Sequence, residues 1–147
     1  MIDSRTAPYA ALLLRVSLAV LFFAHVGLKI FVFTPAGTAK FFGSVGLPSE
    51  VAYVVIAGEL LAALALLLGV WTRVVALLAT PILLGAIFTV HGAAGFFFTN
   101  PKGGWEFPAF WTIALLAQSL LGDGAYALRP SRSEETVGGQ LGGAHSR

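Results

Sequence analysis

The chain has 147 residues, of which 57% are hydrophobic and only 11% are charged. Soluble domains carry about 25% charged residues, so this composition excludes an ordinary water-soluble globule. The formal net charge is +2, and the basic residues are scattered rather than gathered in a stripe, which argues against nucleic-acid binding. Cysteine is absent, which excludes disulfides, thiol redox pairs and cysteine-ligated metal centres. A redox role would therefore need a non-covalently bound cofactor or a partner chain.

Four apolar segments, at about residues 9–33, 51–70, 74–92 and 106–121, predict membrane-spanning helices. The second and third segments are apolar on every face, and a helix of this kind needs lipid or a large protein around it. The sequence therefore predicts an all-α membrane protein, a four-transmembrane-helix bundle over residues 1–128. The polar segment at residues 129–147 is expected to be a disordered C-terminal tail.

Basic residues near the ends of the spans predict the orientation of the bundle. Five arginines fall on one side of the membrane and three lysines on the other: Arg5, Arg15, Arg73, Arg129 and Arg132 against Lys29, Lys40 and Lys102. Because basic residues favour the cytoplasmic side, both termini are expected in the cytoplasm.

Ionisable side chains inside membrane segments are costly, so each one is a candidate functional residue. At about 1.5 Å of rise per residue, the outer half of the predicted bundle holds five of them: His25, Lys29, Glu59, His91 and Glu106. The carboxylate of Glu59 must be protonated, paired with a cation such as Lys29, or open to a wet cavity. A purely structural bridge between Lys29 and Glu59 is one interpretation, and proton relay or ligand binding at Glu59 is the other.

The inner half holds chiefly Arg15, which can extend its charge to the cytoplasmic interface, and Arg73 closes the second span. We expect these two arginines to be structural polar residues.

The two membrane histidines, His25 and His91, allow three interpretations. They could ligate a haem iron from two spans, although their predicted depths differ by roughly 12 Å. They could share a metal with Glu59 or Glu106. The default is that both line a pocket as hydrogen-bonding groups, and we expect no metal site.

The loop at residues 96–108 combines aromatic rings, among them Phe97 and Trp105, with polar and charged ends. Such a lining suits a planar amphipathic molecule such as a quinone headgroup. The alternative is an interfacial aromatic belt, which membrane proteins commonly have.

At these residues the sequence resembles the DoxX family of small bacterial membrane proteins, over about residues 10–128. The matching stretches are Arg15, residues 22–29 (FFAHVGLK), 58–61 (GELL), 66–73 (LLLGVWTR), His91 with 95–97 (GFF), 103–108 (GGWEFP) and 122–124 (GDG). The resemblance implies a four-helix bundle in the bacterial cytoplasmic (inner) membrane. It also implies a link to redox physiology, because some relatives resemble subunits of a quinone-linked thiosulfate oxidoreductase. Others resemble partners in an oxidative-stress complex or quinone-resistance proteins. Recurring polar positions of the family fall on Arg15, Lys29, Glu59, Arg73, His91 and Glu106, but their chemical roles do not carry over.

These observations favour a membrane protein that binds a quinone-like or small apolar ligand in its outer half. In this hypothesis Lys29 and Glu59 set the charge balance, His91 and Glu106 bond to the ligand, and the loop at residues 96–108 covers the opening. The protein would support a redox or detoxification process with a partner protein, as a redox-associated subunit rather than an autonomous enzyme. The alternatives are a small proton-coupled exporter that uses Glu59, and a non-catalytic assembly subunit. A homo-oligomer is also compatible with the sequence.

Overall fold

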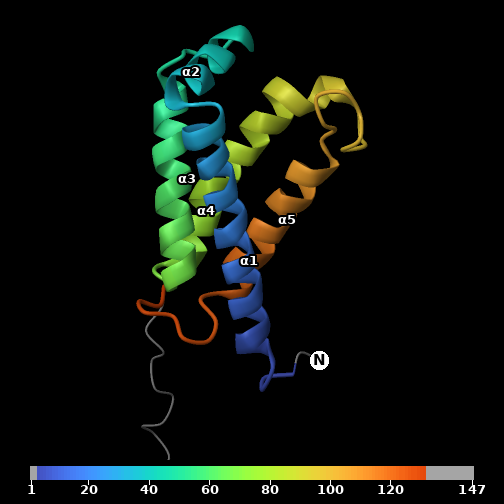
Figure 1. The fold of residues 1–147 in the computed structure, drawn as a ribbon. Helices are drawn as coiled ribbons and strands as arrows, with labels where there is room; N and C mark the ends of the chain where they lie inside the picture. The colour runs from blue at the N-terminus through green and yellow to red at the C-terminus, as the bar shows by residue number, and fades with distance from the viewer. Residues whose placement is uncertain (1–2, 132–147) are drawn as a thin grey trace, which may run out of the picture.

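The computed structural model describes residues 3–131, which fold into helices joined by short turns (Figure 1). Within these residues no strand forms, apart from an isolated bridge between Val70 and Arg129. In chain order the elements are α1 (Ala7–Gly27), the π-helix η1 (Leu28–Val32), α2 (Pro35–Ser44), α3 (Val51–Leu68), α4 (Thr72–Ala86), the π-helix η2 (Ile87–His91), the short η3 (Gly92–Ala94) and α5 (Glu106–Leu121).

Three continuous helical stretches are long and apolar enough to cross a membrane: Ala7–Val32, Val51–Leu68 and Thr72–Ala94. The fourth apolar helix, α5, has 16 residues. At 1.5 Å per residue α5 extends about 24 Å, which is less than the roughly 30 Å hydrocarbon core of a bilayer. The prediction of an all-α membrane protein is therefore confirmed, with three helices of full spanning length.

Small residues in the interior let the helices approach one another closely. Helix α1 packs mainly against α3, and α4 packs mainly against α5, while α3 and α4 join the two pairs. Ala19, Ala63 and Ala76 are fully buried at these contacts, and Phe22 and Leu115 fill the space between them. Small residues of this kind are typical of helix–helix contacts in membranes, where close packing takes over from hydrophobic burial.

The two ends of the bundle differ in construction (Figure 1). The first and the last segments of the described chain lie at one end, which we call the terminal end. Helix α2 and the loop between η3 and α5 lie at the other end, which we call the α2 end. There the upper parts of α4 and α5 diverge from α1 and α3 (Figure 1).

Helix α2 was not expected from the sequence, although a start signal precedes it. The Thr34 hydroxyl accepts a hydrogen bond from the Gly37 N–H at 3.2 Å, and Pro35 occupies the first helical position. Both features are typical of helix N-termini. This capped turn reverses the chain after η1 and lays α2 back against α3.

The segment after α5 is tied to the turn between α3 and α4. The Leu128 N–H donates to the Leu68 carbonyl, and the Arg129 N–H donates to the Gly69 carbonyl, both at 3.1 Å. The Trp71 N–H donates to the Arg129 carbonyl in return. Residues 129–131, which were expected to begin the disordered tail, thus remain close to the bundle. Residues 132–147 of the expected disordered tail lie outside the described residues.

Candidate functional site

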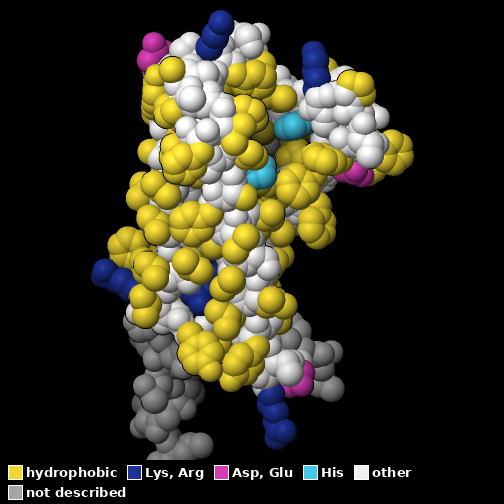
Figure 2. Space-filling model, in the orientation of Figure 1, with side chains coloured by type: hydrophobic (Ala, Val, Ile, Leu, Met, Phe, Trp, Pro, Cys, Tyr) yellow, Lys and Arg dark blue, Asp and Glu magenta, His cyan; other side chains and the backbone are white. Residues whose placement is uncertain are grey.

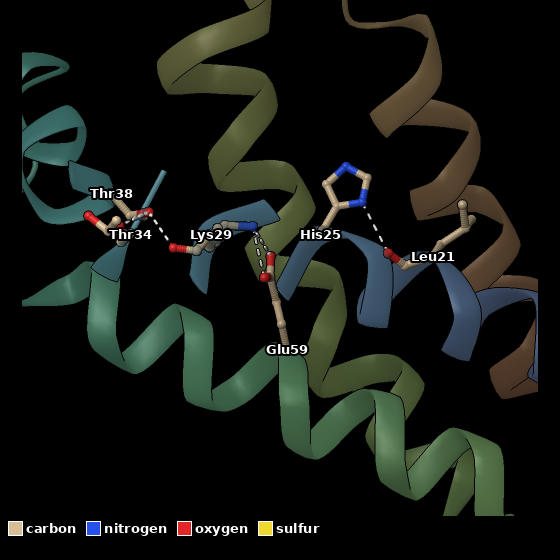
Figure 3. A network of polar contacts seen from close by, with 6 residues as sticks. All are labelled: Leu21, His25, Lys29, Thr34, Thr38 and Glu59. Atoms are coloured by element: carbon tan, nitrogen blue, oxygen red, sulfur yellow. Dashed lines mark hydrogen bonds and ion pairs between the residues drawn. The ribbon is translucent and has the colours of Figure 1, made fainter. Parts of the chain in front are cut away.

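An ion pair between α3 and η1 lies at the centre of the candidate site (Figure 3). The Lys29 ammonium donates to both carboxylate oxygens of Glu59, with each N···O distance 2.8 Å. The side chain of Glu59 is only 4% exposed, whereas the side chain of Lys29 is 17% exposed. Two hydrogen bonds to one carboxylate compensate part of the cost of removing both charges from water. The pair suggested by the sequence therefore exists, and it leaves Lys29 as the more accessible partner.

The backbone of η1 positions Lys29. A π-helical turn holds an extra residue compared with an α-helix, and such turns occur frequently at functional sites. The Lys29 carbonyl accepts a hydrogen bond from the Thr38 hydroxyl at 3.3 Å, and that hydroxyl also donates to the Thr34 carbonyl at 3.0 Å (Figure 3). Helix α2 is thereby fastened to the turn that carries the charged pair.

His25 lies one helical turn before Lys29, on the same side of the chain. Its Nδ1 is 3.0 Å from the Leu21 carbonyl oxygen (Figure 3). The imidazole ring packs against two aromatic side chains of α5. The ring centroids are 4.9 Å apart for His25 and Trp111 and 6.3 Å apart for His25 and Phe107. These contacts fix the orientation of the histidine ring.

A cavity of about 570 Å³ opens between η1 and α2. Its volume falls within the range of small-molecule sites, roughly 300–1,000 Å³. The lining is mostly apolar and aromatic, with a few polar groups: His25, Leu28, Lys29, Val32, Phe33, Gly37, Thr38, Phe41 and Phe42. On the face seen in Figure 2, two histidine side chains lie at the hollow between the α2 region and the α4–α5 loop, surrounded by hydrophobic side chains.

Four other predicted site residues do not line this cavity: His91 ends η2, Phe97 and Trp105 lie in the loop between η3 and α5, and Glu106 begins α5. The Nδ1 atom of His91 is 2.8 Å from the Gly103 carbonyl, and the Glu106 carboxylate accepts from the Phe98 N–H at 2.7 Å. The indole of Trp105 packs edge-on against Phe96, with the ring centroids 4.8 Å apart. These polar groups therefore hold the loop in shape.

Phe97 lies in the same loop and is exposed, with its ring edge-on to that of Phe96 at a centroid distance of 5.3 Å.

In the described part of the chain, no group of three His, Asp or Glu side chains is arranged to hold a metal ion.

At the terminal end, the side chain of Arg15 is buried. Its Nη2 donates to the Ala125 carbonyl at 3.1 Å, and the guanidinium lies directly against the backbone of Gly69. Arg73 donates from Nη1 to the Ser119 and Leu120 carbonyls, both at 3.1 Å. These carbonyls belong to the last turn of α5, where a cation stabilises the helix C-terminus. Both arginines thus bind backbone carbonyls of the α5 end and the segment after it.

Asp123 joins three segments at the same end. Its carboxylate accepts hydrogen bonds from the Thr72 N–H at 3.0 Å and from the Ser131 N–H and hydroxyl, both at 2.8 Å. Burial raises the pKa of Asp123, but these hydrogen bonds together outweigh burial and hold the pKa below its usual value. Asp123 was not among the predicted site residues, because its partner Ser131 lies in what looked like a polar tail.

The cavity-lining residues of α2 were also missed, because α2 itself was not expected. The signal that could have found them was the Thr34-Pro35 start followed by the aromatic pair Phe41-Phe42.

The fold and the buried pair define a helical membrane protein with a charged site near one end. The DoxX family model matches residues 10–92, and the chain belongs to the DoxX family. A relative from Bacillus subtilis (strain 168), named "Putative oxidoreductase CatD", is 40% identical over 119 residues, which cover 81% of this chain and 84% of that protein. No solved structure matches the chain. The family expected from the sequence is thus confirmed.

Proposed function

We propose that this DoxX-family protein binds a quinone-like aromatic molecule in the cavity between η1 and α2, and that it supports a redox or detoxification process with a partner protein. The bundle would cross the bacterial cytoplasmic membrane four times, with α5 as a short fourth span and both termini in the cytoplasm. The α2 end, and with it the cavity, would then face outward.

The observation that carries the proposal is the composition of the cavity wall. Phe33, Phe41 and Phe42 offer flat apolar surface, and Lys29 and His25 offer polar atoms beside it. A planar ring with polar oxygen atoms needs this combination, because stacking supplies affinity and a few hydrogen bonds fix orientation. The name of the relative, "Putative oxidoreductase CatD", is consistent with a redox-active ligand.

The ion pair supports a binding site more than a proton-coupled exporter. Both oxygens of Glu59 bond to Lys29, and the carboxylate is almost completely buried. An exporter that used Glu59 would have to open this pair to substrate and water in every cycle. In the proposed role the pair stays closed and neutralises Lys29, so the cavity receives a donor without a net charge.

The test is a titration of the full chain in lipid nanodiscs with duroquinone, whose ring has no free position for covalent attack by lysine. Replacing two cavity rings, Phe33→Ala with Phe42→Ala, is expected to weaken binding by about tenfold, since each aromatic contact contributes roughly 0.5–1.5 kcal/mol. The matched control is Phe31→Ala, because Phe31 lies in η1, two residues before Phe33, but is 84% exposed and does not line the cavity.

The proposal would be refuted if Phe31→Ala weakened duroquinone binding as much as the double variant does. It would also be refuted if the well-folded wild type showed no saturable binding of duroquinone. A strain that lacks the gene and is complemented with the wild type or the double variant provides the cellular test. We expect the double variant to leave growth under duroquinone stress as impaired as in the empty-vector strain.

A further inference from the structure

His25 offers a hydrogen-bond acceptor at the cavity wall. Its Nδ1 lies 3.0 Å from the Leu21 carbonyl oxygen, and a carbonyl oxygen can only accept. Nδ1 must therefore carry the proton, and in the neutral ring Nε2 keeps its lone pair. Figure 3 shows the second ring nitrogen of His25 directed away from Leu21.

The acceptor nitrogen is held in place and is free to bind a ligand. The ring of His25 is tilted against Trp111 and stacked beside Phe107, with interplanar angles of 60° and 18°. Together with the bond to Leu21, these contacts restrict rotation of the imidazole. Within residues 3–131, Nε2 of His25 takes part in no hydrogen bond.

Lys29 offers a donor on the same wall. Two N–H groups of its ammonium point to the two oxygens of Glu59, and an ammonium has three. His25 and Lys29 are four residues apart on one helical face, and both line the cavity. The cavity therefore presents one acceptor and one donor, set among aromatic rings.

We propose that the cavity selects the hydroxylated, reduced form of an aromatic ligand, a hydroquinone or a related phenol. This inference rests on the function proposed above. The ligand hydroxyl donates to Nε2 of His25, and a second ligand oxygen accepts from Lys29. A quinone carries only acceptor oxygens, so its carbonyl would meet the lone pair of Nε2 and leave that nitrogen unbonded. His25 is thus the residue that discriminates between the two oxidation states.

The experiment compares three probes that share a tetramethylated ring with two para oxygens: durohydroquinone, its dimethyl ether and duroquinone. Each is titrated by calorimetry into the full-length protein in nanodiscs under argon, with ascorbate present for the reduced probe. We expect durohydroquinone to bind roughly fivefold more tightly than either other probe, the effect of one hydrogen bond.

The discriminating variant is His25→Phe, which keeps an aromatic ring beside Trp111 but has no acceptor. It should bind all three probes with similar affinity, and its affinity for the dimethyl ether should match that of the wild type. Similar affinities of the wild type for all three probes would overturn the inference yet leave the cavity as a ligand site. A preference for durohydroquinone that persists in His25→Phe would overturn it as well. Failure of every probe to bind would instead refute the proposed function itself.

Discussion

Removal of either partner of the Lys29–Glu59 pair is expected to destabilise the bundle, but by unequal amounts. In Lys29→Met, the carboxylate of Glu59, whose side chain is only 4% exposed, loses both hydrogen bonds. Breaking a buried pair in this way costs about 3–5 kcal/mol, because one charge is left buried without compensation.

Replacing the other partner, in Glu59→Leu, should lower the stability of the bundle by a smaller amount. The side chain of Lys29 is 17% exposed and lines the cavity, so its long chain can turn the ammonium toward water. We expect a loss of about 1–2 kcal/mol for this variant. The double variant, Lys29→Met with Glu59→Leu, removes both charges and should lie within about 1 kcal/mol of the wild type.

The assay is reversible unfolding in mixed micelles by titration with sodium dodecyl sulfate, followed by far-ultraviolet circular dichroism. The three variants and the wild type form a double-mutant cycle, which isolates the energy of the pair itself. Lys40→Met is the matched control. Lys40 is an exposed lysine on α2, so the same charge is lost without a buried partner, and stability should change by less than about 0.5 kcal/mol.

Additive single effects would refute this reasoning, because additivity means that the two side chains do not interact. An equal loss from both single variants would show that the difference in exposure between Lys29 and Glu59 has no energetic consequence. Both outcomes concern stability, so they can be separated from any effect on ligand binding.

The other predictions concern the terminal end. Gly69→Ala should destabilise the protein by at least about 2 kcal/mol in the same unfolding assay, because Gly69 has a φ of +68° and an added Cβ would collide with the guanidinium of Arg15. Gly85→Ala, at a helical position with open space around it, should be neutral or stabilising, and equal losses in both variants would contradict the steric argument. Arg73→Met should cost about 1–2 kcal/mol, measured likewise, since two carbonyls at the end of α5 lose their donor. For Asp123, the folded pKa is below the unfolded value of about 3.9, so its stabilising effect is complete above that pH and is lost as the pH falls through the folded pKa. Stability measured against pH should therefore show Asp123→Asn less stable than the wild type at neutral pH and converging with it in acid, and a constant difference would refute the assignment.

The candidate pair illustrates how much of the site could be predicted. Glu59 and Lys29 were recognisable because a charge inside an apolar segment is rare and needs a partner, and because depth follows from helix rise. The roles of His91 and Glu106 were not recognisable in this way. Their partners are backbone groups of Gly103 and Phe98, and no sequence pattern states which backbone group a side chain will meet.

The sequence alone determined the class of protein and its four long apolar helices, because hydrophobicity along one helix is a local property that adds up residue by residue. Only the tertiary structure decided where a ligand could fit. The cavity exists because the capped turn at Thr34 folds α2 back over η1, and because a π turn at Leu28–Val32 shifts the wall by one residue. Likewise, the burial of Arg15 depends on the bare backbone of Gly69, far away in the chain. Space between distant segments depends on how whole helices pack, and this packing cannot be read from the order of residues.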